Sequence, residues 1–106
     1  MKQGEIWTLQ GEGYASKPRP VLIIQGAHLD DFNSVVLCLI SSFPTDNPMR
    51  IHIEPSSTNN LNKTSYVMID KIYSAPKDEL GKRIGKLTNS EWAEVTKALK
   101  DLLQLP

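Results

Sequence analysis

The segment from Thr88 to Leu103 constrains the fold most, because it is the one clear helix in the sequence. Thr88 and Glu91 have the spacing of a capping box, in which each side chain accepts a hydrogen bond from the other residue's backbone amide. Apolar residues then recur every three or four positions and share one side of the helix: Trp92, Val95, Leu99 and Leu102. This stripe has to pack against another element, so the helix must cover a sheet built by the preceding chain.

The chain before this helix has the patterns of β-strands. Three segments alternate polar and apolar residues as half-exposed strands do: 5–9, 50–54 and 65–72. Residues 21–24 and 35–40 are continuous aliphatic runs, which suit central strands buried on both faces. Residues 84–87 form either a short strand or an extended lead into the helix. Four or five strands before one helix predict an α+β, mainly β fold: a small, strongly curved antiparallel sheet or partial barrel covered by a C-terminal helix.

Two stretches rich in small polar residues, glycine and proline are predicted to be loops. Residues 10–18 hold two glycines, a serine and a proline, which predicts a mobile loop. Residues 54–63 are a run of turn formers and are predicted to be a loop. The stretch of chain on either side of this loop is too short to build a hydrophobic core of its own. At 106 residues, the whole chain is therefore expected to be one domain, 1–106.

Composition excludes several classes of protein. Twelve basic residues balance twelve acidic ones, which argues against a non-specific nucleic-acid binder but leaves room for a local basic cleft. The single cysteine excludes an intramolecular disulfide and a four-cysteine zinc site, and it suggests a reducing, cytoplasmic setting. The longest apolar run, residues 35–40, is far shorter than the roughly 18 residues that span a bilayer. We expect neither a membrane segment nor a signal peptide.

The inventory of reactive side chains predicts no metal, no cofactor and no nucleophile of a familiar kind. His28 and His52 lie far apart in the sequence and neither has a second ligand three or four residues away. Cys38 lies within an aliphatic run, where it should behave as a small buried hydrophobe with a raised pKa. The sequence also lacks a P-loop, a dinucleotide fingerprint and a nucleophile elbow.

Polar residues at three strand ends remain as candidates. In Lys17-Pro-Arg-Pro20 two prolines fix the backbone around Arg19, so its side chain starts from a rigid position. Ser41 and Ser42 close the next strand, and Asp70-Lys71 closes a third. From these residues alone, a solvated arginine, strand-terminating serines and a simple salt bridge are the simpler interpretations.

The order of these segments resembles the MazF/PemK family of toxin endoribonucleases. The similarity runs almost from end to end through the following segments: 2–7, 17–24, 36–42, 61–71 and 84–88, followed by the amphipathic helix. Each segment alone is weak evidence for the family, but the order of all of them across most of the chain is specific to it.

The resemblance implies a compact SH3-like sheet and a homodimer with RNA in a groove at the dimer interface. It implies metal-independent, sequence-selective cleavage of single-stranded RNA, including mRNA. The 2′-hydroxyl attacks the adjacent phosphate and leaves 2′,3′-cyclic phosphate and 5′-hydroxyl ends. It also implies a cognate antitoxin that occupies the groove. A dimer is independently expected, because the sheet has more aliphatic residues than one helix can cover.

The family's functional positions map onto named residues of this chain. The arginine of the Arg-Pro motif is Arg19, whose guanidinium would bind the scissile phosphate, and the family's threonine or serine is Ser41. Asp70 matches an acidic position near the reacting ribose, which completes the catalytic set. The residues expected to bind RNA are Tyr14, Lys17, Ser42, Arg50 and Lys71.

The chain also departs from its relatives, and the departures keep other functions open. Met68 stands where many relatives have an arginine, and Tyr14 stands where some have a glutamate, while Glu12 is out of register. One alternative is a non-enzymatic toxin of the same fold that inhibits a protein target such as DNA gyrase; Trp92 and residues 103–106 would then be exposed. Another is a nucleic-acid-binding module without activity.

Overall fold

The computed structural model describes residues 1–10 and 17–106. The described residues form six strands, two short 3-10 helices and one α-helix. The strands are β1 (Glu5–Leu9), β2 (Arg19–Ile23), β3 (Ser34–Ser41), β4 (Arg50–Ile53), β5 (Ser65–Pro76) and β6 (Leu80–Lys86). The helical elements are η1 (Ala27–Leu29), η2 (Lys77–Glu79) and α1 (Asn89–Leu103).

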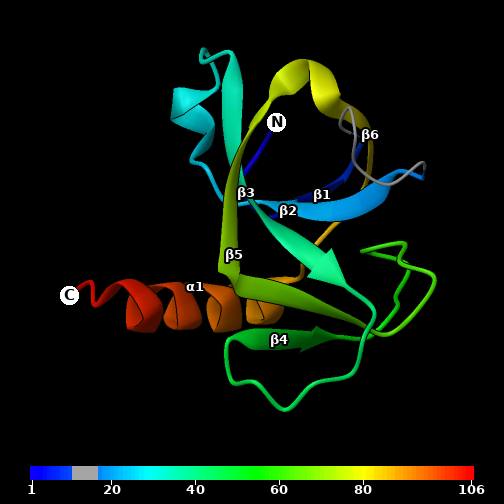
Figure 1. Ribbon diagram of the computed structural model, residues 1–106, viewed down its shortest axis with the longest axis vertical. Helices are drawn as coiled ribbons and strands as arrows, with labels where there is room; N and C mark the ends of the chain where they lie inside the picture. The colour runs from blue at the N-terminus through cyan, green and yellow to red at the C-terminus, as the bar shows by residue number, and fades with distance from the viewer. Residues whose placement is uncertain (11–16) are drawn as a thin grey trace.

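All six strands belong to one antiparallel sheet, in the order β4-β5-β3-β2-β1-β6. The two aliphatic runs form the neighbouring strands β2 and β3 inside the sheet, as the sequence predicts, while β4 and β6 are its edges. The pairing of β3 with β5 shifts register between Cys38 and Ile40, and Figure 1 shows β5 bent sharply along its length. This bend gives the sheet its strong curvature.

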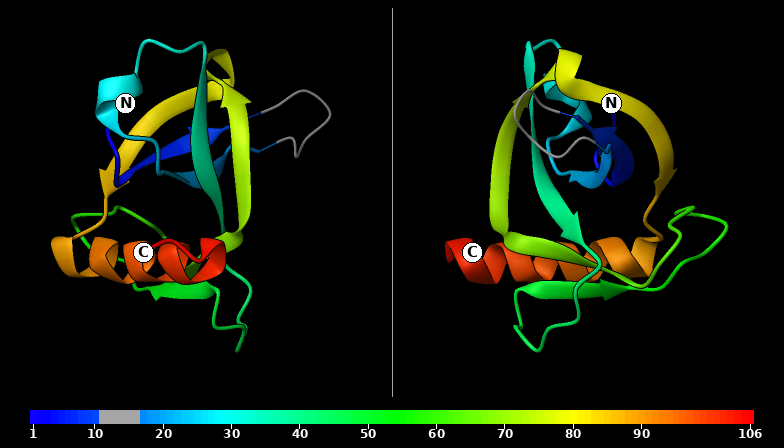
Figure 2. Two further views of the ribbon diagram at one scale, coloured as in Figure 1. Left: turned by 90° about the vertical axis from the view of Figure 1, so that its left-hand side faces the viewer. Right: turned by 45° about the vertical axis from the view of Figure 1, so that its right-hand side comes forward.

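The curvature creates two apolar cores, one on each face of the sheet. The first lies under α1, which runs along β4 and the first half of β5 (Figures 1 and 2). The second lies inside the curl of the sheet and contains Val21, Leu37 and Ala75 among its buried residues. The aliphatic surface that one helix cannot cover is thus largely covered by the sheet itself.

Helix α1 begins as the sequence predicts and ends less buried than predicted. Thr88 Oγ1 accepts a hydrogen bond from the Glu91 amide at 3.2 Å, and Glu91 Oε1 accepts one from the Thr88 amide at 2.8 Å. Val95 is fully buried, whereas Leu102 is 38% exposed although it belongs to the predicted stripe. The reason is that the contacts of α1 are with β4 and β5, and its last turn extends past them (Figure 1).

The loop between β4 and β5 is built around Asn59, which is fully buried. Its amide nitrogen donates to the Glu54 carbonyl at 2.8 Å, and its amide oxygen accepts from the backbone N–H groups of Ser56 and Leu61. The loop also joins β6, where a side chain at Gly85 would collide with the backbone of residues 58–59. The run of turn formers therefore has one fixed shape, since its buried polar groups are paired.

The predicted architecture is confirmed, with two differences in extent. β5 continues to Pro76 rather than ending at 72, and β6 is a full strand from Leu80 rather than a short segment from 84. In both cases most of the additional residues are exposed, so hydrophobic periodicity does not mark them. No helix in the described part of the chain is long and apolar enough to cross a membrane.

Candidate active site

A pocket of about 480 Å³ opens where β2 and β3 separate. The two strands pair from Ile23–Leu37 to Val21–Leu39, and the pairing stops two residues before Arg19 and Ser41. We call this cavity the arginine pocket. It is lined by Thr8, Lys17–Pro20, Ile40–Ser42, Asn60–Lys63, Ser65 and Ile84. Its volume lies within the range of about 300–1,000 Å³ that is usual for ligand sites.

Arg19 stands on one wall of this pocket with its backbone fixed on both sides. Pro18 precedes it and Pro20 follows it, and its Cα is paired with that of Leu9 in β1. The residue is exposed, and it forms no ion pair with any residue in the ranges 1–10 and 17–106. An exposed guanidinium on a rigid backbone is preorganised for a phosphate.

Ser41 lines the same pocket from the end of β3, the strand next to β2. Its Oγ accepts a hydrogen bond from the Phe43 amide at 3.1 Å. This bond occupies a lone pair of the oxygen and leaves the hydroxyl hydrogen available to donate. Ser42, next in the chain, also lines the pocket. The pocket therefore contains hydroxyl donors as well as the arginine.

All the charged side chains among the described residues that line the pocket are positive. Lys17, Arg19 and Lys63 contribute cations, and none of the other described lining residues is an aspartate or glutamate. The zero net charge of the chain thus conceals a local concentration of positive charge. A pocket of this kind attracts an anion with several oxygens, such as a phosphodiester.

Asp70 and Arg50 lie outside the lining of this pocket and bind each other. The Arg50 Nε and one Nη are 2.9 and 3.1 Å from the two carboxylate oxygens of Asp70, a bidentate pair. The hydrogen bonds from Arg50 hold the pKa of Asp70 below its usual value. Lys71, the next residue of β5, is also absent from the lining. Within one chain, the predicted catalytic set is therefore divided: Arg19 and Ser41 share a pocket, and Asp70 is tied to a predicted RNA-binding arginine instead.

Two asparagines of the pocket wall are not among the predicted site residues. Asn60 and Asn62 enter it from the β4–β5 loop, and Asn60 also donates to the Ile84 carbonyl at 2.7 Å. In the sequence, these two asparagines stand out only as members of a run of turn formers. Such a run predicts a loop, but it does not predict which strands the loop contacts. Tyr14 and Glu12 lie outside the described residues.

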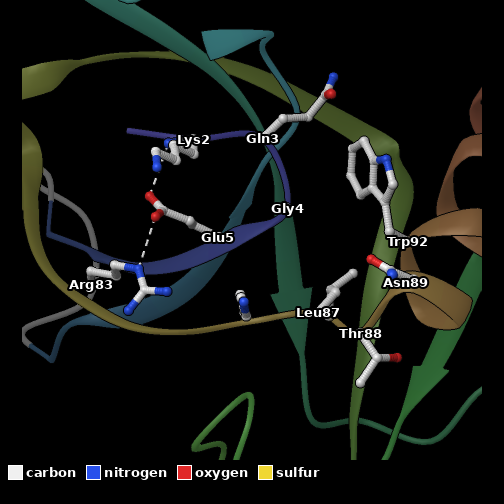
Figure 3. Close-up of a pocket in the computed structure, with 10 residues that line it drawn as sticks. Lys2, Gln3, Gly4, Glu5, Arg83, Leu87, Thr88, Asn89 and Trp92 are labelled. Carbon is white, nitrogen blue, oxygen red and sulfur yellow. Dashed lines mark hydrogen bonds and ion pairs between the residues drawn. The ribbon is translucent and has the colours of Figure 1, made fainter.

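A second pocket, of about 520 Å³, lies beside the start of α1. We call it the tryptophan pocket; it is lined by Lys2–Glu5, Arg83, Lys86–Asn89 and Trp92. Figure 3 shows Glu5 between Lys2 and Arg83, with Trp92 on the far side of the pocket. The Glu5 carboxylate accepts from Arg83 Nε and from the Lys2 amide, each at 2.9 Å. Burial acts to raise the pKa of Glu5, but these bonds and one from Trp7 outweigh it and lower the pKa.

The remaining reactive groups do not form a site. Cys38 is fully buried, and burial, with a smaller contribution from the charge of Asp70, raises the pKa of its thiol to about 12. Such a thiol carries almost no thiolate at neutral pH, so it is a poor nucleophile. Across the part of the chain that the structure describes, no three His, Cys, Asp or Glu side chains gather as a metal site would require.

Comparison with known proteins identifies relatives along the whole chain. Residues 2–103 match the family described as PemK-like, MazF-like toxin of type II toxin–antitoxin system. A probable endoribonuclease MazF of Mycolicibacterium smegmatis is 39% identical over 101 residues, which are 93% of each chain.

Solved structures of this kind share the fold. The toxin MazF-mt6 of Mycobacterium tuberculosis superposes with a TM-score of 0.82 at 24% identity, over 96% of this chain and 98% of that one. A mycobacterial endoribonuclease in complex with its cognate antitoxin gives 0.83 at 24%, over 100% and 97%. MazF of Deinococcus radiodurans gives 0.79 at 19%, over 99% and 97%.

Proposed function

Because the chain belongs to the PemK-like, MazF-like toxin family of type II toxin–antitoxin systems, we propose that it is an endoribonuclease whose active site is the arginine pocket. Its substrate is single-stranded RNA, including mRNA. One observation supports this most directly: a rigid, exposed arginine and a serine hydroxyl line the same pocket, and none of the described residues that line it carries a carboxylate. The named relative, a probable endoribonuclease, supports the same activity.

The proposed reaction is a transfer within the RNA backbone. The ribose 2′-oxygen attacks the adjacent phosphorus, the bond from phosphorus to the 5′-oxygen breaks, and a 2′,3′-cyclic phosphate and a 5′-hydroxyl result. A proton leaves the 2′-hydroxyl, and a proton is delivered to the departing 5′-oxygen. Negative charge builds on the phosphate oxygens during this exchange, so donors placed around the phosphate lower the barrier.

Arg19 and Ser41 supply those donors. The guanidinium can bind two phosphate oxygens at once and remains charged throughout, because arginine does not lose its proton in proteins. Ser41 donates its hydroxyl hydrogen to the phosphate and aligns the linkage for attack. Lys17 and Lys63 add positive charge along the path of the strand. This arrangement neutralises the phosphate with side chains alone.

We also propose that the protein works as a homodimer. Large apolar side chains are exposed after the bend of β5 and at the end of α1: Ile72, Tyr73, Leu102, Leu103 and Leu105. Figures 1 and 2 place the last turns of α1 near that bend, so the two groups belong to one side of the molecule. A second copy would cover this apolar surface.

The partner that restrains the toxin is proposed to be an antitoxin in the same cytoplasm. Relatives of this fold have been solved with cognate antitoxins, which supports such a partner here. An acidic segment would fit the arginine pocket, because the charged side chains among its described lining residues are all basic. The free, buried cysteine is compatible with a reducing compartment.

The decisive experiment is cleavage of a long unstructured RNA by the purified full chain in EDTA, with both new ends mapped. We expect cuts at a short recurring sequence, cyclic phosphate on the upstream fragment and 5′-hydroxyl on the downstream one. Intact RNA at micromolar protein, or activity that requires added metal, would contradict the proposal.

The alternative, inhibition of a protein target such as DNA gyrase, is favoured by one feature of the C-terminus. Leu103 and Leu105 are 50% and 55% exposed, as that function expects. Trp92 is not: it is half-buried and packs on the core under α1. A supercoiling assay with purified gyrase separates the two functions, because the proposed endoribonuclease leaves supercoiling unchanged.

A further inference from the structure

We propose that Tyr66 and His52 form a stacking platform for an RNA base next to the scissile phosphate. This inference rests on the proposed function, because it assigns the neighbouring part of the same substrate path. Neither residue is among those that the family resemblance predicts to bind RNA. The platform is built by three adjacent strands, β3, β5 and β4.

The first observation is that Ser41, Tyr66 and His52 occupy one row across the sheet. The Cα of Tyr66 is paired with that of Ser41 in β3 on one side and with that of His52 in β4 on the other. Side chains of directly paired residues point to the same face. Neighbouring strands are about 4.8 Å apart, so Tyr66 is one strand and His52 two strands from the proposed catalytic serine.

The second observation is that this row faces away from the core. Ser65 and Val67, on either side of Tyr66 in β5, are buried, and so is Ile40 beside Ser41. Because alternate residues of a strand point to opposite faces, Tyr66 points outward while its neighbours point in. His52 is 55% exposed at the side chain. The platform is therefore open to a ligand that already contacts Ser41.

The third observation is that the two rings are stacked and held in place. Their centroids are 5.4 Å apart and their planes differ by 21°. His52 Nε2 lies 3.2 Å from Glu54 Oε1, and that oxygen accepts a hydrogen bond from Thr64. This chain of contacts fixes the imidazole plane. A rigid pair of flat side chains needs little ordering when a third ring is added.

These features fit a nucleobase better than another ligand class. Proteins bind unpaired bases by stacking them on aromatic side chains, beside positive charge that holds the backbone. Here the positive charge is in the arginine pocket, and the flat rings begin one strand away from Ser41. A phosphate between Arg19 and Ser41 would carry its attached base toward Tyr66. Stacking reads no base edge, so the platform supplies affinity and register more than sequence choice.

The experiment measures binding and cleavage separately. Binding uses a fluorescent single strand of mixed sequence made of 2′-O-methyl RNA, which cannot be cut by 2′-oxygen attack, and cleavage uses the unstructured RNA. Tyr66→Leu should weaken binding about 5- to 150-fold, since stacking contributes about 1–3 kcal/mol per base. Tyr66→Phe, which keeps the ring, should bind within about twofold of wild type. The affinity of His52→Ala for the same strand should lie between the affinities of these two variants.

The matched control is His28→Ala, which removes an exposed histidine in η1, outside both pockets. It should bind like wild type, and thermal melting should show that all variants are folded. If Tyr66→Leu does not fold, the affinity of His52→Ala tests the platform instead, because His52 is exposed and its loss should leave the fold intact. Wild-type affinity in the folded leucine or alanine variant would overturn the platform. A wild-type protein that binds the probe but never cuts RNA would instead refute the proposed function and leave the platform intact.

Discussion

The arginine pocket and the tryptophan pocket are nearly equal in size and similar in positive charge, yet they differ in how that charge is used. Their volumes are about 480 and 520 Å³, and each is lined by three lysine or arginine residues. In the tryptophan pocket Arg83 is bound to Glu5 at 2.9 Å. Among the described residues that line the arginine pocket, none carries a carboxylate. The number of cations therefore does not distinguish the two pockets, whereas the presence of a carboxylate bound to one of those cations does.

The two pockets also differ in what their polar groups already do. Around the tryptophan pocket, the Thr88 and Glu91 side chains cap the helix amides and Glu5 accepts three hydrogen bonds. Those groups serve the fold. Arg19 and the hydroxyl hydrogen of Ser41 have no such duty in the described structure. The comparison predicts that matched substitutions in the two pockets have very different consequences.

The largest difference is expected between Arg19→Ala and Arg83→Ala. Loss of Arg19 should reduce kcat/KM for RNA cleavage by about 10²–10³ or more, because a contact made to the charged transition state disappears. Arg83→Ala removes an exposed guanidinium from the other pocket and should cleave like wild type. Single-turnover kinetics on one RNA measures both. Equal activity of the two alanine variants would contradict the assignment of the active site to the arginine pocket.

A smaller effect is expected for Ser41→Ala, which removes one donor to the phosphate. We expect cleavage to fall about 10- to 100-fold, the usual range for one hydrogen bond to a charged group. Ser41→Thr keeps the hydroxyl and should retain most of the activity. If alanine and threonine cleave equally well, Ser41 does not donate to the phosphate.

The lysines should affect binding more than chemistry. Lys63→Ala in the arginine pocket should raise KM several-fold with little change in kcat and lower the salt dependence of binding, with a slope change of about 0.7 for a single strand. Lys86→Ala in the tryptophan pocket should leave both quantities unchanged. Titrations with the 2′-O-methyl strand at several salt concentrations give the slope of log K against log salt concentration for each variant. Identical slopes for the two variants would contradict a contact between Lys63 and the RNA backbone.

The smallest effect concerns the Arg50–Asp70 pair and pH. The pKa of Asp70 is lower in the folded chain than its usual value, so the pair stabilises the fold above the unfolded pKa and is lost as pH falls through the folded one. Asp70→Asn should cost at most about 1 kcal/mol at neutral pH, because the pair is partly exposed. Melting curves of variant and wild type should converge in acid. A loss of cleavage far beyond this stability change would return Asp70 to the catalytic set.

Local patterns in the sequence predict much of this fold. The Thr88–Glu91 cap, the aliphatic runs of β2 and β3 and the alternation in β4 each follow from chemistry within a few residues. The extent of β5 and β6 does not, because most of their remaining residues are exposed on a bent or edge strand. The same holds for Leu102, whose exposure depends on where the sheet ends.

The site is predictable only where a single segment carries it. The prolines around Arg19 predict a rigid arginine, and the resemblance to a family predicts Ser41 as its partner. Asp70 lies outside the lining of the arginine pocket and binds Arg50, which is twenty residues away in the chain. Tyr66 and His52 become neighbours only through the register of β5 with β3 and β4. Register over such distances is a property of the assembled sheet.

The buried thiol of Cys38 gives the molecule an internal reporter. The side chain is fully enclosed at the centre of β3, and its pKa of about 12 suppresses the reactive form. A thiol-specific reagent can therefore label it only after the surrounding strands part, so labelling rates record how often the sheet opens. Following that rate while the protein is titrated with RNA would show whether a ligand in the arginine pocket, which residues 40–42 help to line, changes how often the sheet opens.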